Sequence, residues 1–250
     1  MDKRKVFDTI PEQFDRWRPR YCQPAFDAII EAAHLGAGAS ALEIGPGTGQ
    51  ATEPILKSGC DYLAIELGEH LAAFATERFR GYDNFHLVCD DFVTHDFGAQ
   101  RFDLVLSAAT IQWIPEEVAF PKVFSLLKSG GVLAMMMTRG DYKTLNPALH
   151  AEISQVYERY FHPDIPYTCR MNYANVVNYG FQNFRELAFD TARTLSTEEY
   201  LSFIGTHCDH ITLSEPYRTP FFEGVRAAVD RAGGHVTTIE KVVLYLAEKP

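Results

Sequence analysis

The sequence contains few cysteines, and none of them forms a paired motif. Its five cysteines are spread along 250 residues, and no C-x-x-C occurs. Zinc ribbons and disulfide frameworks need closely spaced cysteine pairs, so neither class is expected, and we predict no metal. Reduced thiols are typical of a cytoplasmic protein, which is the localisation that we predict.

Long apolar segments are also missing. The longest, V-L-A-M-M-M at 132–137, is far too short to span a bilayer and suits a buried strand. The first residues, M-D-K-R-K-V-F-D, lack the apolar segment that a signal peptide requires. We therefore expect no association with a membrane.

Basic residues are fewer than acidic ones: the sequence has 23 Lys and Arg against 33 Asp and Glu, which gives a net charge of -10. A polyanion such as DNA or RNA is repelled by this average charge unless a local basic patch compensates. The basic cluster at 3–5 has no aromatic platform beside it. We predict a small-molecule partner, no nucleic acid, and a monomer or homodimer.

Apolar segments alternate with helical periodicities along the first half of the chain. Strands are expected at 41–44, 62–65, 85–89, 102–107, 132–137 and 237–246, and helices at 24–35, 52–58, 69–80 and 116–128. This alternation predicts an α/β fold: a Rossmann-like, doubly wound, mostly parallel sheet with helices on both faces. We expect the sheet to be seven-stranded, one strand more than the six that the pattern marks. In such sheets, ligands bind beyond the carboxyl ends of the strands.

The alternation of strands and helices stops in residues 140–232, where we predict an inserted helical lid. Ser196 followed by Glu199 forms a capping box, so a helix should run to about Ile204, and a second helix is expected at 215–231. We predict four segments along the chain: an N-terminal cap and first helix at 1–36, a ligand-binding core at 37–139, the lid at 140–232, and a final strand at 233–250 that returns to the sheet.

A glycine loop, G-P-G-T-G at 45–49, follows the first predicted strand. Glycine permits a positive φ and a close backbone approach, and the N–H groups of the next helix suit a carboxylate or phosphate. The dinucleotide fingerprint G-x-G-x-x-G/A needs a small sixth residue, which is Gln50 here. The match to a dinucleotide loop is therefore partial.

Acidic residues mark the ends of the first three predicted strands. Glu43 can orient an ammonium group, and Glu66 can accept the two hydroxyls of a ribose. Asp90 can accept the exocyclic amine of adenine, and Phe92 can pack on the ring face. Each feature alone also fits a plain turn or a solvated strand end. Together, an amino acid, a ribose and an adenine make S-adenosylmethionine.

With these motifs, the chain resembles the class I S-adenosylmethionine-dependent methyltransferases of the small-molecule type (methyltransferase type 11), the group that includes trans-aconitate methyltransferase. The segments that carry the resemblance are A-L-E-I-G-P-G-T-G-Q-A-T, L-A-I-E-L, V-C-D-D-F, F-D-L-V-L-S-A-A-T-I-Q-W-I and L-L-K-S-G-G-V-L, between about residues 40 and 137. F-D-R-W-R-P-R-Y near the start is similar to the N-terminal cap of the same group.

The resemblance implies a set of residues that contact the cofactor. They are Glu43, Gly45, Gly47, Gly49, Glu66, Asp90, Phe92 and Ser107, with Arg18 and Tyr21 closing over the methionine end. Two positions depart from the family pattern. Gln112 stands where relatives often have His, and Ser129 replaces the usual Pro of the L-K-P-G-G turn.

The predicted activity is methyl transfer to a small-molecule O, N or C acceptor, carboxylates included, by in-line displacement. Positioning supplies most of the catalysis, and a general base is needed only if the acceptor arrives protonated. Two alternatives stay open. One is a non-catalytic S-adenosylmethionine-binding protein, and the other is a nicotinamide-dependent dehydrogenase, which Gln50 and Glu43 disfavour.

Candidate residues for the acceptor side are few. His207 and His210 are candidate bases, although histidines that cap a helix or lie on its surface give the same pattern, and no third ligand supports a metal. Trp113 can form the floor of an acceptor pocket or simply pack at a helix start. Arg139 and Arg170 can bind an anionic acceptor, although surface arginines are common.

Overall fold

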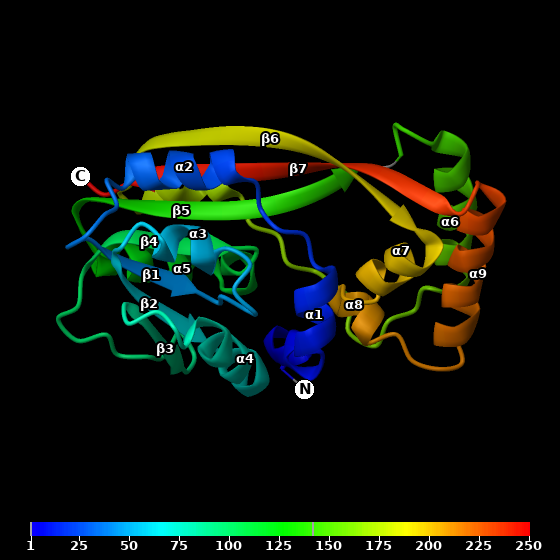
Figure 1. Cartoon of the computed structure of the whole chain (residues 1–250), viewed down its shortest axis with the longest axis horizontal. Helices are drawn as coiled ribbons and strands as arrows, with labels where there is room; N and C mark the ends of the chain where they lie inside the picture. Colours follow the sequence, from blue (N-terminus) through cyan, green and yellow to red (C-terminus); the bar gives the residue numbers. More distant parts are fainter. Residues whose placement is uncertain (1, 142) are drawn as a thin grey trace. The chain divides into compact units, whose positions relative to one another are not determined.

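The computed structural model describes residues 2–141 and 143–250 (Figure 1). The chain divides into two compact units. The glycine-loop unit comprises Pro19–Thr138, Cys169–Phe189 and Val242–Pro250, and the histidine unit comprises Met1–Arg18, Arg139–Thr168 and Asp190–Lys241. The four segments predicted along the chain stay a prediction.

The described residues form strands and helices in the following order along the chain. The strands are β1 (Ser40–Ile44), β2 (Asp61–Glu66), β3 (Phe85–Cys89), β4 (Phe102–Ala108), β5 (Leu127–Asp141), β6 (Gln182–Ser196) and β7 (His235–Glu248). The helices are η1 (Lys3–Thr9), α1 (Pro11–Trp17), α2 (Gln23–Ala32), α3 (Thr52–Leu56), α4 (Glu69–Phe79), η2 (Ile111–Trp113), α5 (Glu116–Leu126), α6 (Pro147–Tyr160), η3 (Tyr173–Tyr179), α7 (Thr197–Ile204), α8 (Cys208–Ile211) and α9 (Arg218–Arg231).

The strands form one seven-stranded sheet in the order β3-β2-β1-β4-β5-β7-β6. Strands β1 to β5 pair in parallel. β7 runs antiparallel to β5, because Gly130 N–H donates to Lys249 O at 2.8 Å and Lys249 N–H donates back to Gly131 O at 2.9 Å. The mostly parallel, doubly wound sheet with helices on both faces confirms the predicted fold class.

The side chains of successive strand residues pack alternately into two apolar cores, one on each face of the sheet. Ala41 of β1 packs with Phe26 of α2 and Phe79 of α4, and its neighbour Leu42 packs in the other core with Phe120 of α5. Figure 1 draws α2 and α3 in front of the sheet and α5 behind it. Strands buried on both faces lack polar alternation, which is why β1 and β4 are apolar in sequence.

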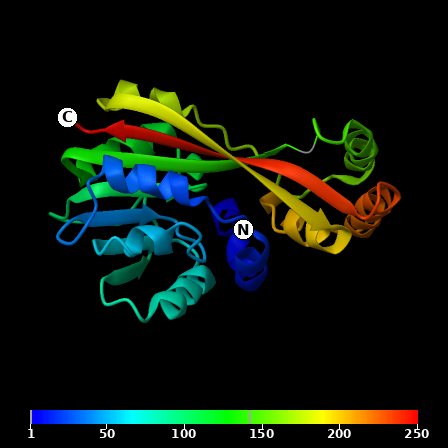
Figure 2. The same cartoon turned by 45° about the horizontal axis from the view of Figure 1, so that its top comes forward.

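The second half of the chain is less helical than we predicted. β5 extends to Asp141, and β6 places fifteen residues of the predicted helical lid in a strand. β6 lies at the sheet edge beside β7 (Figure 2). Its side chains are mostly exposed or half-buried, with Leu195 the one buried residue. An edge strand with little burial needs no apolar run, so hydrophobicity gives little sign of it.

The histidine unit has its own apolar core. Ile153 of α6, Tyr200 of α7 and Phe221 of α9 are buried together. The predicted capping box is confirmed: the Glu199 carboxylate accepts Ser196 N–H at 2.9 Å, and Ser196 Oγ accepts Glu199 N–H at 3.3 Å. The predicted helix at 215–231 is α9, which begins at Arg218.

Within residues 2–141 and 143–250, no helix is both long enough and apolar enough to cross a membrane.

Candidate functional site

The glycine loop turns directly from β1 toward α3 and packs against the residues that follow β4. Gly45 adopts φ +65°, and its N–H donates to Ile65 O of β2 at 2.8 Å. A Cβ at Gly45 would lie 2.7 Å from Thr110 Oγ1. Thr110 Oγ1 in turn lies 3.0 Å from Gly45 O and donates to it. The loop therefore needs glycine for both conformation and space.

Glu66 connects the glycine loop to the next two strands. Its Oε2 accepts Gly47 N–H at 3.0 Å, and its Oε1 accepts Gly68 N–H at 2.9 Å. The backbone carbonyl of Glu66 accepts Asp90 N–H at 2.9 Å. The structure thus brings together the loop, Glu66 and Asp90 at one end of β1, β2 and β3. Each carboxylate oxygen has a second lone pair, so Glu66 retains capacity to accept hydroxyls.

Glu43 is completely buried in β1, just before the loop. Its Oε2 accepts hydrogen bonds from Thr52 Oγ1 at 2.6 Å and Tyr62 OH at 2.8 Å. Burial raises the pKa of Glu43 to about 7, and the charge of Glu66 adds to the rise, while the hydrogen bonds from Thr52 and Tyr62 oppose it. Among the described residues, its Oε1 has no hydrogen-bond partner.

Two more buried polar atoms at the end of β4 have no hydrogen-bond partner within residues 2–141 and 143–250. They are Ser107 Oγ and Gln112 Oε1. Buried polar groups in folded proteins are nearly always paired, so each such atom calls for an explanation. With Glu43 Oε1, these atoms mark the carboxyl ends of β1 and β4 as polar positions that the described protein groups do not satisfy.

Asp90 is exposed at the end of β3 and already has polar partners. Its Oδ1 accepts Asp91 N–H at 2.8 Å, and its Oδ2 lies 2.8 Å from His95 Nδ1. The hydrogen bond from His95 lowers the pKa of Asp90, so the side chain is a carboxylate near neutral pH. It can accept an adenine amine only alongside these contacts, and that role stays a prediction.

Phe92 is buried in one of the two sheet cores. Its ring centroid lies 5.9 Å from that of Phe97 and 5.2 Å from Lys122 Nζ. Lys122 is held there by two backbone carbonyls, Val93 O at 3.0 Å and His95 O at 2.7 Å. Core packing explains this position by itself, and a contact of Phe92 with adenine stays a prediction.

The two residues predicted to close over the methionine end belong to different units. Tyr21 lies in the glycine-loop unit, where its ring packs edge-on against Phe26 with centroids 6.3 Å apart. Arg18 lies in the histidine unit, and its guanidinium covers the rings of Phe7 at 5.5 Å and Phe14 at 5.2 Å. Their predicted contacts with the cofactor stay predictions.

The predicted acceptor residues are likewise divided between the units. Trp113 is half-buried in η2 of the glycine-loop unit, and its backbone N–H donates to Thr110 O at 2.9 Å. Arg170 is exposed in the same unit and Arg139 is exposed in the histidine unit. The structure does not bring the two arginines together within one unit.

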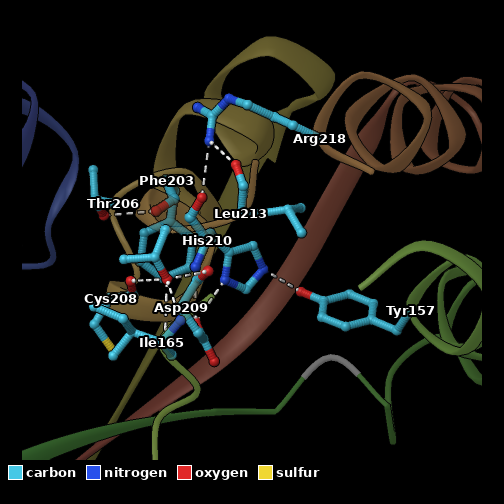
Figure 3. Close-up of polar contacts among 10 residues, drawn as sticks. Tyr157, Ile165, Phe203, Thr206, Cys208, Asp209, His210, Leu213 and Arg218 are labelled. Carbon is cyan, nitrogen blue, oxygen red and sulfur yellow. Dashed lines mark hydrogen bonds and ion pairs between the residues drawn. The ribbon is translucent and has the colours of Figure 1, made fainter. Parts of the chain in front are cut away.

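His210 lies in the core of the histidine unit (Figure 3). Its Nδ1 is 2.8 Å from Asp209 Oδ1, and its Nε2 is 2.7 Å from Tyr157 OH. A carboxylate can only accept, so Nδ1 carries the proton and Nε2 accepts from the tyrosine. Arg218 donates to His210 O at 2.9 Å and to Leu213 O at 3.2 Å, which fixes the same turn. A surface position for His210 is therefore wrong.

His207 is half-buried at the N-cap of α8. Burial lowers the pKa of His207 well below its usual value, and the charges of Arg18 and Arg193 lower it further. The neutral imidazole can accept a proton, and its catalytic role stays a prediction. In the described part of the chain, no cluster of three or more His, Cys, Asp or Glu side chains could hold a metal ion.

Comparison with known proteins identifies the domain that contains the glycine loop. The family model for the methyltransferase domain matches residues 42–135. These residues are a methyltransferase domain. The match begins within β1, ends within β5 and includes the loop, Glu66 and Asp90. The resemblance to class I S-adenosylmethionine-dependent methyltransferases is thereby confirmed.

Curated relatives match part of this chain. Ribosomal RNA small subunit methyltransferase A of Pseudomonas fluorescens is 32% identical over 110 residues, which are 44% of this chain and 40% of the relative. Malonyl-[acyl-carrier protein] O-methyltransferase of a Marinomonas species is 27% identical over 157 residues, 61% of this chain and 55% of the relative. The chain therefore spans 40% and 55% of the lengths of these two relatives.

A solved methyltransferase structure has a fold similar to that of this chain. Phosphoethanolamine N-methyltransferase 2 of Haemonchus contortus, in complex with phosphomonomethylethanolamine and S-adenosylhomocysteine, aligns with a TM-score of 0.56. The alignment covers 97% of this chain and 57% of that protein at 17% identity. At this identity, the likeness extends to the fold alone.

Sequence reasoning missed several residues that build the loop edge. Thr52 and Tyr62 hold Glu43, Thr110 closes on Gly45, and His95 pairs with Asp90. Tyr62 and Thr110 lie in other elements than the residues that they contact, so spacing does not reveal them, whereas His95 follows Asp90 by five residues in the same loop. Thr52 had a local signal, as the first residue of the helix after the loop.

Proposed function

We propose that this chain transfers a methyl group from S-adenosylmethionine to a small-molecule acceptor. The observation that carries the proposal is the connected edge formed by Gly47, Glu66 and Asp90 at the ends of three adjacent parallel strands. An anion-tolerant loop, a ribose-binding carboxylate and an adenine-binding carboxylate follow one another there in the order of the cofactor's parts.

Unpaired buried atoms support the fit of this cofactor. Glu43 Oε1 and Ser107 Oγ lack hydrogen-bond partners among the described residues. Glu43 lies in β1 just before the loop, and Ser107 lies in β4, the strand next to β1 in the sheet. A carboxylate and a hydroxyl at the ends of β1 and β4 suit the ammonium group of a methionine moiety. In this proposal, Gly45, Gly47 and Gly49 carry the backbone past the ligand, and Glu66 accepts the ribose hydroxyls.

The cofactor supplies a methyl group that its positive sulfur has already activated. The protein therefore contributes alignment and exclusion of water, which can lower the barrier by roughly 7–11 kcal/mol. Glu66 performs the positioning, because one side chain both holds Gly47 N–H and faces the predicted ribose. A proton must leave an amine or hydroxyl acceptor, and neutral His207 stays a candidate for that step.

A small molecule is favoured over ribosomal RNA as the acceptor, although a ribosomal RNA methyltransferase is similar to part of this chain. The 32% identity to such a relative covers 44% of this chain. The net charge of -10 opposes a polyanion, whose binding depends on phosphate neutralisation by Lys and Arg. A cytoplasmic location and a monomeric or dimeric state stay predictions.

Calorimetric titration of the whole chain with S-adenosylmethionine, S-adenosylhomocysteine and NAD tests the proposal. We expect micromolar binding of the first two ligands and none of NAD. Glu66→Ala should abolish the binding, whereas Glu31→Ala, an exposed residue of α2 in the same unit, should leave it unchanged. Binding of NAD alone would support a dehydrogenase, and absence of all binding would refute the cofactor site.

Catalysis needs a second measurement, because a non-catalytic cofactor-binding protein would give the same titration. Transfer of a labelled methyl group to small-molecule acceptors, or to ribosomal RNA as the competing class, separates the two functions. Cofactor binding without transfer to any acceptor would favour the non-catalytic alternative.

A further inference from the structure

We propose that His95 positions the Asp90 carboxylate to accept the exocyclic amine of adenine, and that it thereby sets the preference of the cofactor site for adenine over a purine that carries a carbonyl oxygen there. The inference rests on the proposed function and deepens it, because it assigns a residue that makes the site selective for an adenine nucleoside. Both residues lie in the glycine-loop unit, in the segment that follows β3.

The Asp90 carboxylate has one donor on each of its oxygens. Oδ1 accepts Asp91 N–H at 2.8 Å, and Oδ2 lies 2.8 Å from His95 Nδ1. A carboxylate can only accept, so Nδ1 of His95 carries the proton. Because the carboxyl torsion of an aspartate is otherwise broad, two donors on two different oxygens fix the plane of the group. Each oxygen keeps a further lone pair for a ligand.

A ligand can reach the Asp90 side chain, of which 48% is exposed. The hydrogen bond from His95 lowers the pKa of Asp90, so the group is ionised near neutral pH. The exocyclic amine of adenine is a hydrogen-bond donor, which suits a carboxylate. A purine with a carbonyl oxygen in that place presents an acceptor to an acceptor, and a site built for a donor rejects such an analogue.

Three further contacts hold His95 in place. Its backbone N–H donates to Asp91 O at 2.9 Å, and its ring packs edge-on against Phe97 with centroids 4.6 Å apart. Its carbonyl accepts from Lys122 Nζ of α5 at 2.7 Å. A residue held at its N–H, its carbonyl and its ring keeps its donor at Asp90 before any ligand arrives. The carboxylate therefore loses little entropy when it binds the amine, which a mobile water in place of His95 would not achieve.

Stability alone gives a weak reason for the pairing of His95 with Asp90. The side chains are 22% and 48% exposed, and ion pairs at such positions contribute little to the free energy of unfolding. His95→Ala should therefore fold normally, with a Tm close to that of the wild type. Its effect on ligand binding can then be attributed to the direction of the carboxylate.

Calorimetric titration of the whole chain with two ligands tests the inference. They are S-adenosylhomocysteine and S-inosylhomocysteine, which has a carbonyl oxygen in place of the amine. The wild-type protein should bind the first at least about tenfold more tightly. His95→Ala should weaken S-adenosylhomocysteine by about fivefold or more and change S-inosylhomocysteine by less than about twofold. A merely structural loss would weaken both ligands equally, so the ratio of the two affinities isolates the positioning role.

Three variants complete the experiment. His95→Asn keeps a donor near the place of Nδ1 and should restore most of the wild-type ratio. His86→Ala, at an exposed histidine of β3, is the matched control and should leave both affinities unchanged. Asp90→Ala should remove the preference for adenine, and adding His95→Ala to it should change nothing further, because the two residues act as one unit.

The failure of this inference is distinguishable from failure of the proposed function. If the wild-type protein binds neither ligand, the proposed cofactor site fails and the inference falls with it. If it binds both equally, or if His95→Ala keeps the wild-type ratio, the cofactor site stands and the role of His95 is wrong. An equal loss of both affinities in His95→Ala would also overturn that role, since His95 would then only maintain the fold of the segment.

Discussion

Gly47 N–H donates to the Glu66 carboxylate at 3.0 Å, so the acidic residue at the end of β2 holds the loop that follows β1. The second oxygen of Glu66 accepts Gly68 N–H at 2.9 Å. One carboxylate therefore fixes the turns after two adjacent parallel strands. This arrangement positions the loop before any ligand arrives, which reduces the entropy lost on binding.

Replacement of Glu66 should affect stability as well as binding. Glu66→Ala removes the partner of two backbone N–H groups, and we expect the free energy of unfolding to fall by about 2 kcal/mol. Glu66→Gln keeps one acceptor and should lose less. Urea denaturation measures both changes, with exposed Glu31→Ala as the control. A Glu66→Ala protein as stable as the control would show that these hydrogen bonds do not stabilise the loops.

Gly49 is required by both backbone conformation and packing. It adopts φ +91°, and an added Cβ would lie 2.6 Å from Cζ of Phe79, a buried ring of α4. Gly49→Ala should lower the free energy of unfolding by about 2 kcal/mol or more, because strain and overpacking add. Gly81→Ala, where an added Cβ meets no atom within 4 Å, is the matched control. Equal stability of the two variants in urea denaturation would contradict this account.

The stability of the protein should depend on the protonation of Glu43. Burial raises the pKa of Glu43 from 4.5 to about 7 in the folded state. The folded state therefore binds more protons than the unfolded state between these values, so the free energy of unfolding falls as pH rises through this window. The shift corresponds to a loss of about 3 kcal/mol once Glu43 is fully ionised.

Glu43→Gln removes this titration. Its free energy of unfolding should change less than that of the wild type between about pH 5 and about pH 8. Urea denaturation across this range measures the slope, and exposed Glu31→Gln should keep the wild-type profile. An unchanged slope in Glu43→Gln would mean that other groups cause the pH dependence.

The hydrogen bond between Tyr157 and His210 should stabilise the histidine unit. Tyr157→Phe removes the donor to the buried Nε2, and we expect a loss of about 1 kcal/mol in the free energy of unfolding. Tyr160→Phe, on the same helix with its ring against Arg159, is the control. Thermal or urea unfolding with no difference between the two variants would assign the contact no role in stability.

Local patterns predicted the methyltransferase domain well. The strands at 41–44, 62–65 and 102–107 are buried on both faces, so continuous apolar residues marked them directly. The glycines of the loop were visible because their positive φ excludes most other residues. The capping box at Ser196 depends on residues three apart in sequence, and it was found for the same reason.

Features that depend on contacts between distant elements escaped prediction. β6 is an exposed edge strand beside β7, and the two run antiparallel because Asn183 contacts Glu248 at one end and Thr194 contacts Thr237 at the other. His210 was predicted as a candidate base, with a helix-capping or surface position as the alternative, yet Tyr157 and Asp209 satisfy both ring nitrogens in a core. Asp209 is the preceding residue, but Tyr157 and Glu248 come from elements tens of residues away, which local periodicity cannot register.

The amino-acid sequence by itself determined the α/β class, the glycine loop and the order of acidic strand ends, because these depend on short-range sterics and on hydrophobic periodicity. Tertiary structure alone decided that Glu66 holds Gly47, that Glu43 is buried with a raised pKa, and that Gln112 turns a buried carbonyl away from Ala109. These properties depend on which groups the fold brings within hydrogen-bond distance and which it removes from water, and both are settled only when separate elements pack together.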